Sequence, residues 1–301
     1  MAISESQLIT WSHQGAIQTS ASTYDSVKKC IDNVNWNSEV KYDIYLQGSY
    51  KNSTNIRGNS DVDIVVELSS VFYSNKEQLP ADQLAEFNAY YETGKHKLAD
   101  FKKVVLETLI GNYGEGNVKE GNKSIVIKGN EGRLNADVIC CASYREYKSF
   151  SRSNPHDYTE GITFWHKNNN QQIRNFPKQH YDNGVSKNQS SGLNYKSIIR
   201  IIKNMNTKLV ELTRIADNLA PSYYVECMLY NVPSGSFNQT YYQDVIGIIL
   251  DYLATQSDSG KLNDFICQNG KRYLFRGIDP YWDLAACRIY LQQLINFFNE
   301  R

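Results

Sequence analysis

The sequence lacks the segments that direct proteins into membranes or out of the cell. Its first residues, MAISESQLIT, contain neither a basic stretch nor an apolar core, so we expect no signal peptide. The apolar run VIGIIL at residues 245–250 is far shorter than the roughly 20 apolar residues of a membrane-spanning helix. We therefore expect a cytoplasmic protein without a membrane partner.

The chain also lacks an excess of charge and a cysteine cluster. Lys and Arg together number 32, as do Asp and Glu, and this balance argues against a broad face for binding long nucleic acid. It leaves room for a small basic pocket that takes one or two nucleotides. The six cysteines contain no CxxC pair, so we expect each to fill core space rather than bind metal or form a disulfide.

The first part of the chain predicts a mixture of helices and strands. Apolar spacing favours a helix over residues 5–31 and another from Pro80 to about residue 110. Strands are expected at Tyr42–Leu46 and 62–68, paired as a hairpin with a long polar connection. Further strands are expected at residues 124–128, 134–141, 159–165 and 172–174.

The rest of the chain is almost entirely helical in pattern. Helices are expected at residues 193–212, from Pro221 onward, and at residues 241–254 and 281–298. No flexible linker, repeat or low-complexity tract separates the two parts. The change at about residue 178 predicts two domains, 1–177 and 178–301, packed on each other with an active-site cleft between them.

Two acids stand close together at the start of a predicted strand. Asp61 and Asp63 flank one valine, and residues i and i+2 of a strand point to the same face, roughly 6–7 Å apart. Adjacent carboxylates repel unless a cation neutralises them, and hard oxygen ligands suit Mg²⁺. The simpler alternative is a strand end that carries two solvated acids.

Two further features favour the cation. Gly48 and Ser49 follow a strand, at a turn whose bare N–H groups and hydroxyl suit phosphate oxygens. Asp137 is the one acid in the apolar strand LNADVICC, where an isolated charge would be costly. The turn is not a Walker A loop, because GxxxxGK[ST] is absent. Three carboxylates beside such a turn fit two-metal phosphoryl or nucleotidyl transfer.

These motifs resemble those of a known superfamily. A Gly-Ser pair, a spacer, Asp-x-Asp on a strand and a distant third Asp are typical of polymerase-β-like nucleotidyltransferases. Residues 175–205 and 220–233 (APSYYVECMLYNVP) resemble the bacterial CD-NTases of CBASS anti-phage systems, the cGAS/DncV-like enzymes, and within them the CdnE-like clade. The resemblance implies an α+β fold, with a mixed sheet and flanking helices packed on a C-terminal helical lobe.

The resemblance also implies roles for particular residues. Asp61, Asp63 and Asp137 would bind two Mg²⁺ ions, which Mn²⁺ would replace, and Asp137 would promote deprotonation of the acceptor hydroxyl. Gly48 and Ser49 would hold the β- and γ-phosphates. The other expected nucleotide-binding residues are Lys203 and Ser222 at the triphosphate, Lys196 as a secondary candidate there, Tyr223 stacked on the donor base and Asn175 at a base edge.

Ordinary structural roles stand beside three of these assignments. Without the resemblance, Lys203 would be interpreted as a solvated helix lysine, Tyr223 as a core aromatic and Asn175 as a loop residue. The five histidines are scattered singly, so we expect neither structural zinc nor activation by double-stranded DNA. His180, in PKQH, is expected to pack or hydrogen-bond at a helix start rather than act as a catalyst.

The function implied is template-independent synthesis of a cyclic dinucleotide from NTPs, with release of pyrophosphate. Similarity to the clade favours uridine or adenine in the product. A product-sensing effector protein encoded nearby would be the partner. One alternative is a nucleotidyltransferase that modifies a tRNA end, a protein or a small molecule, and another is a catalytically silent nucleotide-binding module.

Overall fold

The protein, seen here as a computed structural model, is described over residues 3–15, 17–58, 61–277 and 281–300. Its backbone contacts group into two compact units. The sheet unit comprises residues 17–50 and 61–178, and the helical unit comprises residues 1–16, 51–60 and 179–301. Each unit has its own apolar core.

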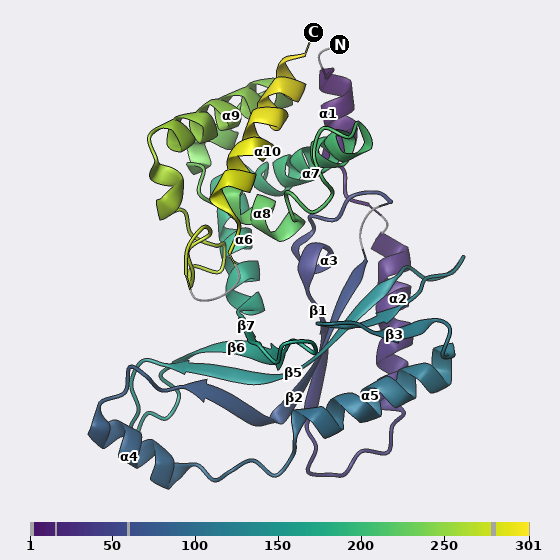
Figure 1. Ribbon diagram of the computed structural model, residues 1–301, viewed down its shortest axis with the longest axis vertical. Helices are drawn as coiled ribbons and strands as arrows, with labels where there is room; N and C mark the ends of the chain where they lie inside the picture. The colour runs from purple at the N-terminus through teal and green to yellow at the C-terminus, as the bar shows by residue number, and fades with distance from the viewer. Residues whose placement is uncertain (1–2, 16, 59–60, 278–280, 301) are drawn as a thin grey trace. The chain divides into compact units, whose positions relative to one another are not determined.

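The sheet unit is built on one mixed sheet (Figure 1). Its strand order is β1-β2-β5-β4-β3, with β6 paired to β5 and β7 paired to β6. Only β2 and β5 run parallel among the described strand pairs. The strands are β1 (Tyr42–Leu46), β2 (Val62–Asn75), β3 (Val118–Glu120), β4 (Ile125–Ile127), β5 (Ala136–Tyr147), β6 (Tyr158–Trp165) and β7 (Gln172–Asn175).

The β2–β5 ladder has an irregularity in its middle. Leu68 pairs with Ala142, but the next paired residue on β2 is Phe72, opposite Ser143. The backbone N–H groups of Ser69 and Ser70 donate instead to the carbonyl of Lys41. The sheet therefore keeps buried backbone groups paired while β2 carries three more residues than β5.

Helices α2 (Ile17–Asp32) and α5 (Leu98–Tyr113) cover one face of the sheet (Figure 1). Val27 of α2 and Val105 of α5 pack in the same core as Ile64 of β2. Alternate residues of β2, such as Val65, belong to a second apolar cluster on the other face. This alternation is the period of two expected for a strand buried on both faces.

One predicted long helix is two helices. The pattern favoured a helix from Pro80 to about residue 110, but α4 (Ala81–Tyr90) ends and α5 starts afresh at Leu98. Phe87 of α4 packs edge-on against Tyr147 and Phe150, and this aromatic contact fixes the direction of α4. The short strand β3 was not predicted, because its three residues, VKE, show no strand pattern.

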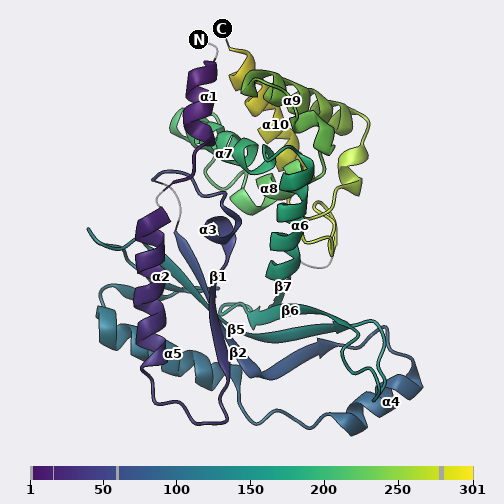
Figure 2. The same cartoon turned by 180° about the vertical axis from the view of Figure 1, so that it is seen from behind.

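The helical unit joins three separated stretches of chain (Figure 2). Helix α1 (Glu5–Ser12) contacts α7 (Tyr195–Glu211) and α9 (Tyr242–Asp258), and Leu8 lies in their core. The remaining elements are α6 (Pro177–Ser190), α8 (Ser222–Tyr230), η1 (Ser234–Phe237), η2 (Lys261–Asp264) and α10 (Leu284–Asn299). Short helix α3 (Gly48–Asn52) runs from the sheet unit into residues 51–60.

The N-terminal helix predicted over residues 5–31 is interrupted before α2. Gly15 donates its N–H to the Asn55 carbonyl, and a Cβ on Gly15 would lie 2.6 Å from the Ile56 carbonyl oxygen. Only glycine allows the two backbones to approach this closely. The domain boundary at residue 177 stays a prediction, but α1 groups with the helical unit rather than with the sheet where the prediction put it.

The predicted burial of the cysteines is confirmed for five of the six. All six cysteines are free thiols, and five of them are buried. None of the helices in the described chain is both long and apolar enough to span a bilayer.

Candidate active site

Two of the three predicted acids lie side by side in the sheet. Asp63 of β2 and Asp137 of β5 are register partners on adjacent parallel strands. Neighbouring strands are about 4.8 Å apart, so both carboxylates lie within reach of one cation. Ser124 Oγ, just before β4, donates to Asp137 Oδ1 at 3.0 Å.

The third acid, Asp61, precedes β2 and is solvent-exposed. Its Oδ1 accepts a hydrogen bond from Asn135 Nδ2 at 3.1 Å. Burial raises the pKa of Asp137, the hydrogen bond from Ser124 opposes that rise, and the negative charge of Asp61 adds to it. The two carboxylates therefore repel each other, as acids that share a site do.

The donor set suits a hard divalent cation. Carboxylate oxygens are the ligands such ions prefer, and a cation would relieve the repulsion between Asp61 and Asp137. Within the described residues, no three His, Cys, Asp or Glu side chains are already gathered around one metal position. To bind a metal, Asp61 would have to give up its exposed hydrogen bond from Asn135, which costs about 1 kcal/mol of free energy.

Gly48 lies directly against Asp63. Its φ is +63°, and a Cβ placed on it would lie 1.9 Å from Asp63 Oδ2. The predicted turn is the first turn of helix α3, in which Ser49 is the second residue. Glycine lets the chain reverse straight after β1, where the Gln47 N–H donates to the Asp63 carbonyl. Gly48 is thus required by backbone geometry and by contact with a site carboxylate.

In the helical unit, Lys203 is buried beside a carboxylate. Lys203 Nζ lies 3.5 Å from Glu226 Oε1, and the two residues are 5% and 4% exposed. Thr54 Oγ1 donates to the same oxygen at 2.7 Å, while His180 Nε2 lies 3.6 Å from Oε2. The interpretation of Lys203 as a solvated lysine is therefore wrong, and the expected packing role of His180 is confirmed.

Tyr223 is held at its hydroxyl, yet it is one of the exposed large side chains of the helical unit. The side chain is 44% exposed, and one face stacks on the His180 ring at 5.4 Å. Burial against the thiols of Cys227 and Cys267 raises the pKa of the Tyr223 hydroxyl well above its usual value, and Asn269 Nδ2 donates to it at 3.4 Å. The interpretation as a core aromatic is wrong, because the residue is 44% exposed.

The remaining predicted residues are less deeply held. Lys196 is half-buried, and its Nζ lies 5.6 Å from the ring centre of Tyr181, which Lys51 Nζ also approaches, at 4.7 Å. Burial lowers the pKa of Lys196, and Arg200 lowers it further. Ser222 begins α8 and is exposed; half-buried Asn175 ends β7. Thus Gly48, Asp63 and Asp137 gather in the sheet unit, while Lys203 and Tyr223 are linked through His180 and Glu226 in the helical unit.

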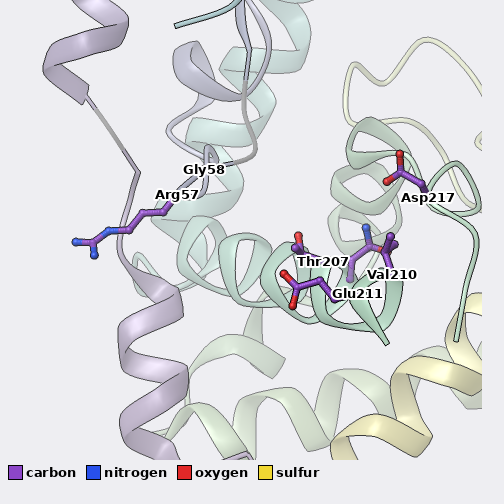
Figure 3. Close-up of a pocket in the computed structure, with 7 residues that line it drawn as sticks. Arg57, Gly58, Thr207, Val210, Glu211 and Asp217 are labelled. Carbon is purple, nitrogen blue, oxygen red and sulfur yellow. The ribbon is translucent and has the colours of Figure 1, made fainter. Parts of the chain in front are cut away.

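The helical unit also contains a cavity of about 480 Å³, to which neither group of candidate residues contributes (Figure 3). No predicted site residue lines it, and the Arg57 side chain extends away from the other labelled residues (Figure 3). Its lining consists of Arg57, Gly58, Asn206, Thr207, Val210, Glu211 and Asp217.

Comparison with known proteins assigns both parts of the chain. Residues 27–111 match the nucleotidyltransferase domain, and residues 182–299 match the cGAS/DncV-like nucleotidyltransferase C-terminal helical domain. A protein of Rhodothermus marinus named cyclic UMP-AMP synthase is 40% identical over 98% of this chain and 97% of its own length. The chain belongs to the cGAS/DncV-like nucleotidyltransferases.

A second relative and the solved structure of the R. marinus relative also match this CD-NTase along nearly its whole length. A cyclic nucleotide synthase of Staphylococcus haemolyticus is 36% identical over 100% of both chains. The structure of the R. marinus CdnE c-UMP-AMP synthase with Apcpp and Upnpp matches with a TM-score of 0.87 and 38% identity, over 98% of this chain and 96% of that one. The predicted fold class and family are confirmed, and nucleotidyltransferases in general use divalent metal ions.

Sequence reasoning missed Glu226, the residue around which Lys203 and His180 gather. A signal was present, because Glu226 is the one acid in the apolar helix SYYVECMLY. The argument that singled out Asp137, a lone charge in an apolar element, applies to Glu226 equally.

Proposed function

We propose that this CD-NTase makes a cyclic dinucleotide from two NTPs and releases pyrophosphate. The cyclic dinucleotide would serve as a second messenger in anti-phage defence. The observation that carries the proposal is the pairing of Asp63 with Asp137 in one register, with Gly48 packed on the Asp63 carboxylate. The name of the R. marinus relative supports uridine and adenine as the bases.

In this proposal the carboxylates bind the metal ions and accept the proton of the attacking hydroxyl. Asp137, whose pKa is raised by burial, is suited to accept the proton of the attacking hydroxyl. Asp61, Asp63 and Asp137 would hold the metal, for which we propose two Mg²⁺ ions, replaceable by Mn²⁺, and no zinc. Bound there, the ions supply neutralisation of the triphosphate and of the leaving pyrophosphate.

The other residues position the nucleotides. Gly48 and Ser49 offer backbone N–H groups to the β- and γ-phosphates, and Lys203, Lys196 and Ser222 add charge and hydrogen bonds at the triphosphate. The exposed ring of Tyr223 offers its outer face to the donor base, because His180 occupies the other. Asn175 reads a base edge. Catalysis of this kind rests on positioning and on charge stabilisation.

The partners follow from this chemistry. NTPs are the substrates, and the product would act on an effector protein encoded nearby. We propose no activation by double-stranded DNA and no membrane partner, with the enzyme working in the cytoplasm.

The test is a reaction with all four NTPs and Mg²⁺ or Mn²⁺, treated with phosphatase and read by mass spectrometry. The Asp61→Asn/Asp63→Asn protein serves as the control. A phosphatase-resistant dinucleotide made by the unmutated chain alone is expected, and its mass identifies the bases. Pyrophosphate release that depends on an added RNA, protein or small-molecule acceptor would overturn the proposal, as would nucleotide binding without any pyrophosphate release.

A further inference from the structure

The helical unit buries a charged cluster that stability alone does not account for. Glu226, Lys203, His180 and Thr54 are 4%, 5%, 7% and 2% exposed. Removing charges from water costs several kcal/mol per ion, and buried ion pairs are often no more stable than apolar replacements of the same shape. A buried cluster of this kind is therefore weak evidence for a stabilising role.

The carboxylate of Glu226 is fixed from two sides. Thr54 Oγ1 donates to Oε1 at 2.7 Å, and His180 Nε2 lies 3.6 Å from Oε2. Burial alone would raise the pKa of Glu226, but Lys203, His180 and Thr54 together outweigh burial and lower it. Glu226 is therefore a buried, ionised carboxylate with a set orientation.

Lys203 is held less tightly than Glu226. Its Nζ lies 3.5 Å from Glu226 Oε1, at the outer limit of a hydrogen bond. An ammonium group has three N–H donors, and within the described residues Glu226 is the one hydrogen-bond partner of Lys203 Nζ. The carboxylate thus takes one of the three N–H donors, in a long hydrogen bond, and leaves the other two for a phosphate oxygen.

We propose that Glu226 is a positioning residue that orients the Lys203 ammonium toward the triphosphate of a bound nucleotide, with Thr54 fixing the carboxylate in turn. This inference rests on the proposed function, since it takes Lys203 as a triphosphate ligand. Thr54 lies five residues after Ser49 in the chain, so the segment that follows the phosphate-binding turn also fixes the lysine's partner.

The test measures binding of a non-hydrolysable α,β-methylene ATP analogue, with Mg²⁺, to Glu226→Gln, Lys203→Met and the double variant. Glu226→Gln is expected to weaken binding about tenfold in the unmutated background and less than threefold in the Lys203→Met background. Binding of adenosine, which has no phosphates, is expected to stay within twofold, whereas a general structural role would weaken it too. The matched control is Glu211→Gln, which removes the partner of Lys208 in an exposed ion pair on α7, the helix that contains Lys203.

Equal losses in both backgrounds, or a parallel loss of adenosine binding, would overturn the proposal. If thermal unfolding shows that Glu226→Gln does not fold, Thr54→Val takes its place, since it removes the hydrogen bond to Oε1 and keeps the charge. Thr54→Val should weaken binding of the analogue several-fold only when Lys203 is present, and unchanged binding there would refute the positioning role.

The binding comparison does not depend on product formation. A chain that binds the analogue but makes no dinucleotide would therefore contradict the proposed function and leave the positioning role to be judged from binding. A chain that does not bind it would fail both.

Discussion

Replacing Gly48 by alanine tests the contact between the turn at Gly48, where we propose that phosphates bind, and the Asp63 carboxylate. The new Cβ would lie 1.9 Å from Asp63 Oδ2, whereas ordinary contacts begin at 3.4 Å, so the two groups must separate by about 1.5 Å. A positive φ adds a backbone cost of about 1–2 kcal/mol for any residue other than glycine. A misplacement of this size in an active site costs about 100-fold in rate.

Gly260→Ala is the matched control. Gly260 also has a positive φ, +74°, but nothing lies within 4 Å of the position its Cβ would take. Both variants should therefore lose about 1–2 kcal/mol of unfolding free energy from the backbone alone.

Two assays separate these effects. Denaturant unfolding reports the shared loss of stability, and the initial rate of pyrophosphate release reports the site. We expect Gly260→Ala to keep the rate of the unmutated enzyme and Gly48→Ala to fall about 100-fold. If the Gly48→Ala rate came within threefold of the Gly260→Ala rate, the contact with Asp63 would have no part in catalysis.

Three further changes test other parts of the structure. Asp137→Asn should abolish pyrophosphate release and leave the melting temperature unchanged or higher, because it removes a half-buried charge that Asp61 repels. Glu120→Gln should cost about 1 kcal/mol of stability at pH 7, since hydrogen bonds from Lys102 and Lys167 lower the pKa of Glu120. A lowered pKa gives stability that is present above the unfolded pKa of about 4.3 and lost as the pH falls through the folded value, so the two proteins should converge in acid. Tyr223→Ala should weaken NTP binding by about 1–3 kcal/mol, and Tyr223→Phe, which keeps the ring, by much less.

Specific results would contradict each of these. Activity in Asp137→Asn above a few per cent would exclude the acid from the metal site. A Glu120→Gln difference that grew toward acid would mean that the lysines do not stabilise the ionised carboxylate. Equal affinities for the Phe and Ala variants of Tyr223 would remove the ring from base recognition.

The three candidate acids can be recognised in the sequence because their signals are local. Asp61 and Asp63 stand two residues apart at a strand start, and Asp137 is a lone acid in an apolar strand, so composition over a few residues reveals them. The pairing of Asp63 with Asp137 needs a parallel ladder between strands that are far apart in sequence, which no local pattern specifies. The contact between Glu226 and Thr54 also joins segments far apart in sequence, so no local pattern reveals it.

Errors in the predicted elements also have long-range causes. The helix expected over residues 5–31 is broken at Gly15 by the close approach of the backbone at Ile56. The expected long helix after Pro80 ends where Phe87 packs on Tyr147 of β5 and Tyr91 packs on Phe72 of β2. Helical spacing reports which face is apolar, but it does not report where a partner forces the chain to turn.

The irregularity in the β2–β5 ladder separates two registers that can change independently over evolution. The inner register, from Val62 opposite Ala136 to Leu68 opposite Ala142, contains both paired aspartates, and a one-residue slip there would turn one of them to the opposite face. The outer register begins at Phe72, after three residues that have no partner on β5. Insertions or deletions beyond Phe72 can therefore reshape the far end of the sheet without realigning Asp63 and Asp137, whereas a single deletion between Asp63 and Leu68 would shift the inner register itself.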